Sequence, residues 1–487
     1  MHPEFSRLKT PTLCAAYAAL SIAGISLLGS QVYLDPTFEN ADTLCLAMAG
    51  VFLASSLIIP ARLWGKVRHS TSLCFFFIAL PLLCGYAIFI PPFTIPDEFT
   101  HINRVFNNQS MSELLVPSQL PDAYEWIEGY TAMGELLFSP FSYDDVKPTD
   151  FTASAYSTIN YLIPSAIASL GKLLNVNGFF MLFVCRLADG LVYLGAAAWM
   201  LKTLPFGKRA ASVFLLNPLL LQQEASCSAD VLCNIGALCF VVQLIRMLSL
   251  PPERIRPIHW IQLIAFIALI AVCKYVYLIL VLTALLLYPK IGSRKLRLAL
   301  PGIFAIALMA AVFFIASRGY GETLNNLLTN GQLADLWPCI MNTATERGVF
   351  YLSMFFGGNL GWPLMHGSFV PPVVLIPRIW MLSAALLFLG FLFDSSPLVK
   401  IKAWQRVTML VIACLTGFIT FIALWDYKSV ALDYYQSRYL IPAVFLALFA
   451  LLPRWKTPLE KVPPQAFMAL MALIGWAELG AVFLHFS

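Results

Sequence analysis

Long apolar runs, alternating with short basic clusters, constrain this chain more than any other feature of its sequence. A run of about 18 or more apolar residues is long enough to cross a bilayer as a helix. Such runs recur along all 487 residues, and only 12% of the residues are charged, against roughly a quarter in soluble domains. The sequence therefore predicts an all-α, polytopic integral membrane protein.

We expect about thirteen spans, at residues 13–33, 43–61, 72–92, 178–201, 210–225, 231–249, 259–273, 275–289, 298–316, 372–393, 407–424, 439–453 and 464–484. The stretch 259–289 is predicted as two short helices that meet at Lys274, because a charged residue in the middle of one long helix would be costly. Residues 157–173 are predicted to be interfacial or re-entrant, since Pro164 and Lys172 interrupt the run.

The placement of Lys and Arg predicts the orientation of these spans. With 259–289 counted as two spans, the basic clusters between spans all fall on one side, which the positive-inside rule assigns to the cytoplasm together with the N-terminus. The long loops 91–157 and 317–371 then lie outside, where we expect short amphipathic helices. Loops of this length are usually functional.

Several classes of function have no support in the sequence. There is no GxGxxG or Walker A loop for a nucleotide, and the dispersed basic residues do not form a nucleic-acid surface. The eleven cysteines include no CxxC pair and lie mostly in apolar runs, where cysteine is usually a small buried hydrophobe. We therefore expect neither a disulfide framework nor a cysteine metal site.

Polar residues that should meet at the outer face come from four places in the chain. Ionisable groups at a membrane edge are costly, so they are functional candidates by default. They are Asp97, Glu98, His101 and Arg104 in the first loop, Glu224 and Asp230 around the turn after 210–225, Lys274 and Tyr277 at the hairpin turn, and Gln436, Arg438 and Tyr439 before the span 439–453.

This combination indicates transfer of a group from a phosphate. A carboxylate can take the proton of an acceptor hydroxyl, and Lys and Arg can hold the phosphate. We expect Asp97 to be the general base and Glu98 to orient the acceptor, with His101 and Arg104 supporting them. Structural roles stay open beside these: helix capping for the carboxylates, Asp230 included, and snorkelling to the interface for Lys274 and Arg438.

Five segments resemble a bacterial membrane family known as domain-of-unknown-function family 2142: "IPDEFTHINRVF", "NPLLLQQEASCSAD", "CKYVYLILVL", "FGGNLGWPL" and "QSRYLIPAV". The resemblance covers about residues 85–455. That family in turn resembles the GT-C class of membrane glycosyltransferases, which use a polyprenyl-phosphate sugar and an acidic residue in the first outer loop. The resemblance implies that Asp97, Glu98 and Asp230 are the catalytic acids and adds Trp362 to the substrate-binding residues.

The resemblance also implies the organisation and the activity. Residues 1–70 would form two N-terminal helices, 71–455 a GT-C-like catalytic core and 456–487 a C-terminal helix. The reaction would be inverting or retaining transfer of a sugar from polyprenyl phosphate to a lipid-linked or cell-envelope glycan, such as an O-antigen, outside the bacterial inner membrane. The chain lacks a DxD triplet, so no metal ligand is assigned and use of a divalent cation stays open. A transporter or flippase of lipid-linked sugars, and a polysaccharide polymerase or ligase, are the alternatives.

Overall fold

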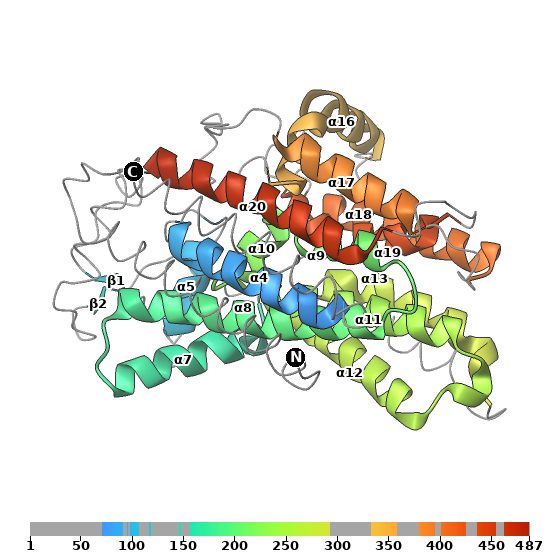
Figure 1. Cartoon of the computed structure of the whole chain (residues 1–487), viewed down its shortest axis with the longest axis horizontal. Coiled ribbons are helices and arrows are strands. Elements are labelled where there is room, and N and C mark those ends of the chain that lie inside the picture. The colour runs from blue at the N-terminus through green and yellow to red at the C-terminus, as the bar shows by residue number, and fades with distance from the viewer. Residues whose placement is uncertain are drawn as a thin grey trace, which may run out of the picture.

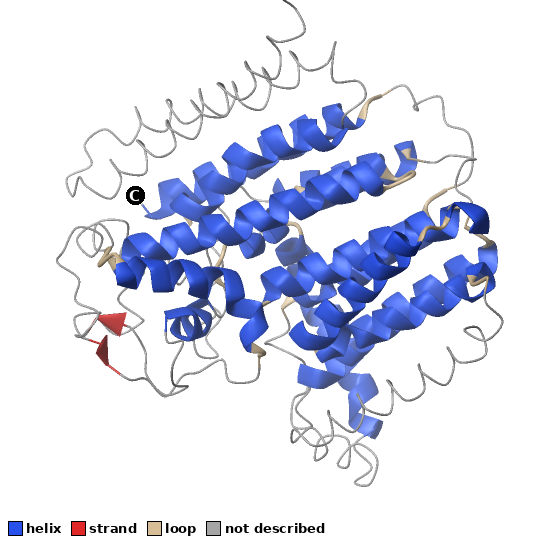
Figure 2. Cartoon of the chain, turned by 90° about the horizontal axis from the view of Figure 1, so that it is seen from below, coloured by secondary structure: helices blue, strands red, loops and turns tan. Residues whose placement is uncertain are grey.

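The computed structural model is a bundle of helices that run roughly along its long axis (Figures 1 and 2). It describes residues 71–90, 95, 98–106, 116–117, 146–147, 156–292, 333–357, 379–394, 401–424, 436–453 and 462–486. The predicted spans 13–33, 43–61 and 298–316, together with Asp97 and Trp362, lie outside the described residues.

The α-helices are α4 (Thr71–Phe89), α5 (Glu98–Phe106), α7 (Leu162–Leu173), α8 (Gly178–Thr203), α9 (Lys208–Leu215), α10 (Pro218–Glu224), α11 (Asp230–Ser249), α12 (Pro257–Cys273), α13 (Leu278–Val281), α16 (Leu333–Phe355), α17 (Ile379–Phe393), α18 (Ala403–Leu424), α19 (Ile441–Leu451) and α20 (Pro464–Phe486). Short 3-10 helices are η3 (Thr158–Tyr161), η4 (Pro252–Arg254), η5 (Tyr275–Tyr277), η6 (Leu282–Lys290) and η8 (Ser437–Leu440). Two short strands, β1 (Val116–Pro117) and β2 (Val146–Lys147), pair antiparallel, with Val116 opposite Lys147.

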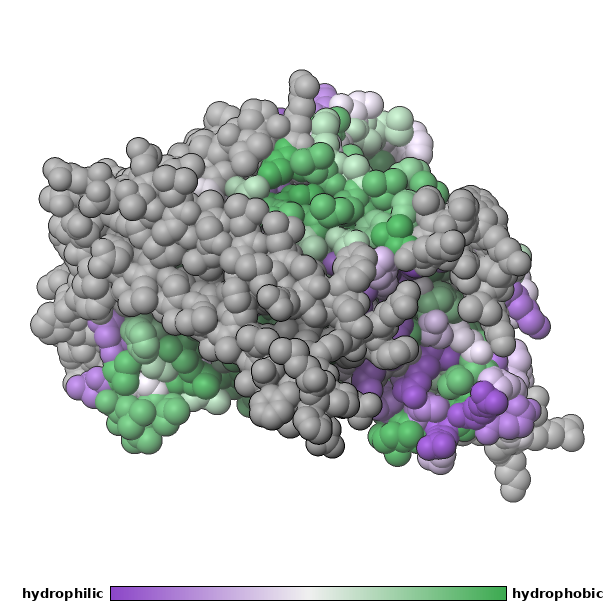
Figure 3. Space-filling model, viewed as in Figure 1, coloured by the Kyte–Doolittle hydropathy of each residue, from purple (hydrophilic) through white to green (hydrophobic). Residues whose placement is uncertain are grey.

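Within the described part of the chain, four helices are long and apolar enough to cross a membrane: Thr71–Phe89, Phe180–Thr203, Asp230–Ser249 and Ala403–Ile422. Shorter apolar helices occupy Pro257–Cys273, Leu278–Lys290, Ile379–Phe393 and Ser437–Leu451. All of them coincide with predicted spans. The exposed leucines of α7 form the hydrophobic patch at the lower left of Figure 3, consistent with a helix at or in the membrane.

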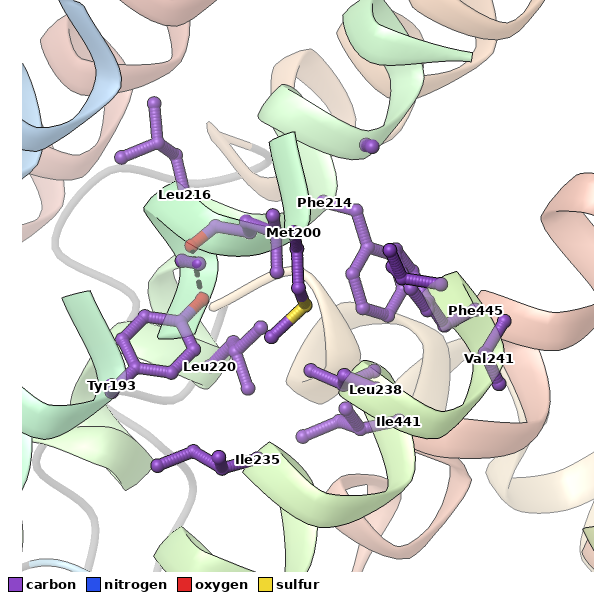
Figure 4. Close-up of a cluster of buried hydrophobic side chains, with 14 of the residues drawn as sticks. Tyr193, Met200, Phe214, Leu216, Leu220, Ile235, Leu238, Val241, Ile441 and Phe445 are labelled. Carbon is purple, nitrogen blue, oxygen red and sulfur yellow. Dashed lines mark hydrogen bonds between the residues drawn. The ribbon is translucent and has the colours of Figure 1, made fainter. Parts of the chain in front are cut away.

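The predicted span 210–225 is two short helices rather than one. The chain breaks between α9 and α10, where Asn217 accepts a hydrogen bond from the Leu219 N–H at 3.0 Å and Pro218 begins α10. The break frees the Leu215 carbonyl, which accepts a hydrogen bond from the Tyr193 hydroxyl at 2.6 Å (Figure 4). A buried helix end is tolerated only with such partners.

The prediction of a helical hairpin over 259–289 agrees with the structure. At the turn, the Lys274 ammonium lies 2.7 Å from Asp230 at the start of α11. At the other end of the hairpin, the Lys290 ammonium donates to the Leu250 carbonyl, just past the end of α11. The chain therefore passes along α11 twice between residues 257 and 290.

One end of the bundle gathers basic side chains, and we call it the basic end. Arg209 pairs with Asp394 at 3.1 Å and donates to the Val462 carbonyl, while Arg406 donates to the Leu452 carbonyl. Charged residues between α11 and α12 make the hydrophilic patch at the lower right of Figure 3. The predicted site residues lie toward the opposite end.

Between these ends lies one large hydrophobic core. It joins α4, α8, α9, α11, α19 and α20, and Phe355 at the end of α16 also enters it. The Phe214 and Phe445 rings, from α9 and α19, lie 5.0 Å apart (Figure 4). This packing fixes the helices whose ends carry the candidate site.

Candidate functional site

Three charged residues that are far apart in the sequence meet at the start of α11, and we call them the Asp230 cluster. The Lys274 ammonium lies 2.7 Å from Asp230 Oδ1, and the Arg438 Nε lies 3.2 Å from Asp230 Oδ2. All three side chains are at least largely buried. A single carboxylate therefore holds two cations.

Local structure accounts for how each member reaches the cluster. Asp230 opens α11, and its N–H donates to the Ser228 hydroxyl at 3.2 Å. Lys274 follows the last residue of α12, where the chain becomes extended and turns back. Arg438 lies in η8 and also donates to the Gln223 amide oxygen at 3.1 Å.

Tyrosine rings surround the Lys274 ammonium. It lies 4.2 Å from the centre of the Tyr439 ring, 5.5 Å from Tyr277 and 5.8 Å from Tyr156. These distances are within the range of cation–π attraction. The pKa of Lys274 is raised well above its ordinary value, because burial lowers it but the Asp230 carboxylate and the tyrosines raise it by more. The side chain is therefore a fixed positive charge.

Helix α5, from the first long loop, lies over this cluster. His101 Nδ1 is 2.7 Å from the Tyr161 hydroxyl, and its ring packs edge-on against Tyr156 at 5.3 Å. The Arg104 guanidinium lies 5.8 Å from the Tyr161 ring. Because Tyr156 also contacts Lys274, the structure brings His101 and Arg104 together with the Asp230 cluster.

Glu98 is buried, and its carboxylate is paired with an arginine. Its carboxylate is 0% exposed and forms an ion pair with Arg186 of α8, whose side chain is also 0% exposed. Arg186 Nε donates to Glu98 Oε1 at 2.8 Å, and the Cys227 N–H donates to the same oxygen at 3.3 Å. In the structure Glu98 therefore holds α5 against α8, and its expected role in orienting the acceptor stays a prediction.

Sequence reasoning missed Arg186, although a signal was present. It is the single Arg in the apolar run of α8, and an ionisable residue inside a span is rare without a partner or a function. We also missed Tyr156 and Tyr161, because neutral tyrosines near a membrane edge are common and carry no such signal.

Of the remaining predicted residues, two are described by the structure and two are not. Glu224 is fully buried and accepts a hydrogen bond from Asn234 at 2.9 Å. Gln436 is buried at the start of η8, beside Arg438. Asp97 and Trp362 lie outside the described residues, so their expected roles remain predictions. In the described ranges, no group of three or more His, Cys, Asp or Glu side chains could hold a metal ion.

Two further acids are buried inside the bundle, in helices where the sequence predicted no site residue. Asp189 of α8 is 1% exposed and Glu478 of α20 is 3% exposed. Asp189 Oδ2 and both carboxylate oxygens of Glu478 have no hydrogen-bond partner among the residues described. Burying a carboxylate without a partner is costly, so these two positions differ from the paired acids of the Asp230 cluster.

A family model described as "Predicted membrane protein (DUF2142)" matches residues 80–447. Neither a curated protein nor a solved structure matches the chain. The matched segment begins within α4, includes the Asp230 cluster and η8, and ends within α19. Because the match spans most of the 487 residues, this chain is a membrane protein of the DUF2142 family.

Proposed function

We propose that this protein is a glycosyltransferase that moves a sugar from a polyprenyl-phosphate donor to a glycan acceptor. The observation that carries the proposal is the Asp230 cluster, in which Lys274 and Arg438 converge on one carboxylate. Two cations against one carboxylate leave a net positive charge in a largely buried site. Such a site suits the phosphate of a lipid-linked donor.

The two cations would recognise the phosphate in different ways. Lys274 stays protonated and would act as a point charge, whereas the Arg438 guanidinium offers a planar fork to two phosphate oxygens. The N-terminus of the long helix α11 begins at Asp230, and its dipole favours an anion at the same place. The donor phosphate would share the two cations with Asp230.

Asp97 is the carboxylate that we assign as general base. Asp230 already pairs with two cations, and Glu98 is fully buried in its pair with Arg186, so both carboxylates are already engaged. Asp97 directly precedes α5, the helix that contacts the tyrosines around Lys274. This proximity in the chain supports the assignment.

The proposed reaction is balanced without a further reactant. The oxygen of the acceptor hydroxyl forms a bond to the anomeric carbon of the donor sugar. The bond between that carbon and the phosphate oxygen breaks, and its electron pair leaves with polyprenyl phosphate. The hydroxyl proton passes to Asp97, as general base catalysis requires.

The distribution of basic side chains between the two ends of the bundle supports an extracytoplasmic site. Basic side chains gather at the other end, which the positive-inside rule would place in the cytoplasm. A reaction outside the cell has no supply of nucleotide sugars, so its donor must arrive activated and anchored in the membrane. A polyprenyl-phosphate sugar meets both conditions.

The test is sugar transfer and donor binding in proteoliposomes that contain labelled polyprenyl-phosphate sugar. Lys274→Ala and Arg438→Ala should each weaken donor binding, and Arg438→Lys should also weaken it because lysine lacks the fork. Lys290→Ala is the matched control, since Lys290 binds only a backbone carbonyl among its described contacts, at the basic end. Donor binding as tight in both alanine variants as in the parent would contradict the proposal.

A transporter or flippase for lipid-linked sugars is the second candidate, and the buried acids favour it. Carboxylates buried inside a membrane protein mark proton and substrate pathways in transporters. Neither carboxylate oxygen of Glu478, nor Oδ2 of Asp189, has a hydrogen-bond partner in the described structure. The broken helix α9–α10 is also a feature of transporters. The two functions separate in one assay: a flippase moves the labelled donor across the vesicle membrane without transferring its sugar, and loses that movement in Glu478→Gln.

A further inference from the structure

One side chain holds both ends of the segment that joins α4 to α5. Arg186 Nη1 donates to the carbonyls of Ala87 at 3.1 Å and Ile90 at 2.7 Å, at the end of α4. Its Nε and Nη2 bind the two carboxylate oxygens of Glu98, the first residue of α5. The segment between these contacts carries Asp97.

We propose that Arg186 is a positioning residue for Asp97: it ties the end of α4 to Glu98, the first residue of α5, and Asp97 is bonded directly to Glu98 in the chain. The inference rests on the proposed function, in which Asp97 is the base. An arginine suits the task because its planar guanidinium donates in several fixed directions at once. Both Arg186 and Glu98 are fully buried, so water does not compete for these bonds.

The same ion pair also connects α5 to the turn that leads into Asp230. The Cys227 N–H donates to Glu98 Oε1 at 3.3 Å, three residues before Asp230. One turn further along α5, His101 contacts Tyr161 and Tyr156. Movement of Glu98 would therefore shift α5, and with it Asp97, relative to Lys274 and Arg438.

The basic end offers a matched control. There Arg209 donates to the carbonyls of Phe393 at 3.2 Å and Val462 at 2.7 Å and pairs with Asp394 at 3.1 Å. Arg209 thus joins helices through two carbonyls and one carboxylate, as Arg186 does. It lies at the basic end, away from the proposed chemistry. An equal loss of kcat in the two arginine variants would therefore indicate a general effect on the structure.

The experiment compares Arg186→Lys with Arg209→Lys in proteoliposomes. Arg186→Lys should lower kcat by about a hundredfold, since a small misplacement of a catalytic group costs about that much, while the KM for the labelled polyprenyl-phosphate sugar changes little. Arg209→Lys should change neither. Equal losses of kcat in the two variants would overturn the proposal.

A second measurement does not depend on activity. In a background with the native cysteines replaced by alanine, Asp97→Cys is labelled with an impermeant maleimide, alone and combined with each arginine variant. The labelling rate should change with Arg186→Lys and not with Arg209→Lys. An unchanged rate would overturn the positioning role, even if the parent protein shows no sugar transfer and the proposed function fails.

If the Arg186→Lys protein does not accumulate in membranes, Glu98→Gln provides the same test. It keeps the size of the side chain and removes the charge that orients the guanidinium. It should lower kcat and change the labelling rate at residue 97 as Arg186→Lys does. Normal kcat together with an unchanged labelling rate would again overturn the proposal.

Discussion

Arg186 carries its charge inside a helix that is otherwise almost entirely apolar. Removing such a charge from water costs several kcal/mol, and the cost is recovered only where the partners are well placed. Glu98 and the carbonyls of Ala87 and Ile90 supply those partners. At the residue scale, the ion pair therefore exists because each member would be unstable in this environment without the other.

This dependence predicts a strong coupling between the two residues. Glu98→Ala and Arg186→Met should each destabilise the protein by about 3–5 kcal/mol, because each leaves one buried charge unpaired. The double variant should lose less than the sum of the two. Unfolding of the purified proteins in detergent measures all three, and additive losses would show that the two charges act independently.

A second prediction at this scale concerns the base. Asp97→Asn keeps the shape of the side chain and removes the proton acceptor, so sugar transfer should fall by about a hundred- to ten-thousandfold. Binding of the labelled donor should persist, because Lys274 and Arg438 are unchanged. Near-normal turnover of Asp97→Asn at matched protein levels would remove the first loop from the chemistry.

At the scale of elements, short broken helices and helix ends bring polar groups into the bundle. The α9–α10 break depends on Asn217 and Pro218, and Gly357, two residues after the end of α16, has a φ of +88°. A Cβ at Gly357 would lie 2.5 Å from Glu478 Oε2 and 2.5 Å from the Pro218 Cβ. Only glycine fits both the left-handed backbone and this close approach.

Two glycines of the same segment should therefore respond in opposite directions. Gly357→Ala should destabilise the protein by at least about 2 kcal/mol, through backbone strain and overpacking. Gly348→Ala, within α16 and with nothing within 4 Å of an added Cβ, should stabilise it by about 0.5–1 kcal/mol. Thermal unfolding in detergent distinguishes them, and equal stability of the two variants would refute this account of Gly357.

At the scale of the whole molecule, charge is divided between two ends. Cations at both ends bind carbonyls and carboxylates: Arg209 pairs with Asp394 at the basic end, and Arg186, Lys274 and Arg438 pair with Glu98 and Asp230 toward the other end. The proposed orientation therefore rests on where Lys and Arg gather, which is what the positive-inside rule counts.

The orientation can be tested by labelling single cysteines in a cysteine-free background. Asp122→Cys and Gln332→Cys, in the two long loops, should react with an impermeant thiol reagent added outside intact cells. Glu253→Cys, at an exposed position between α11 and α12, should react only after permeabilisation. The reverse pattern would invert the topology and place the proposed site on the cytoplasmic side.

The sequence by itself determined the membrane class, the positions of the described spans and the hairpin at Lys274, because hydrophobic length and the spacing of charges act locally along the chain. It also identified Asp230, Lys274 and Arg438 as costly charges at span ends. Only the tertiary structure decided how those charges pair. The sequence does not reveal that Glu98 faces Arg186 rather than an acceptor, or that α9 and α10 are separate, because these depend on contacts between residues far apart in the chain. A buried charge must find a partner, but which partner it finds is set by how the helices pack.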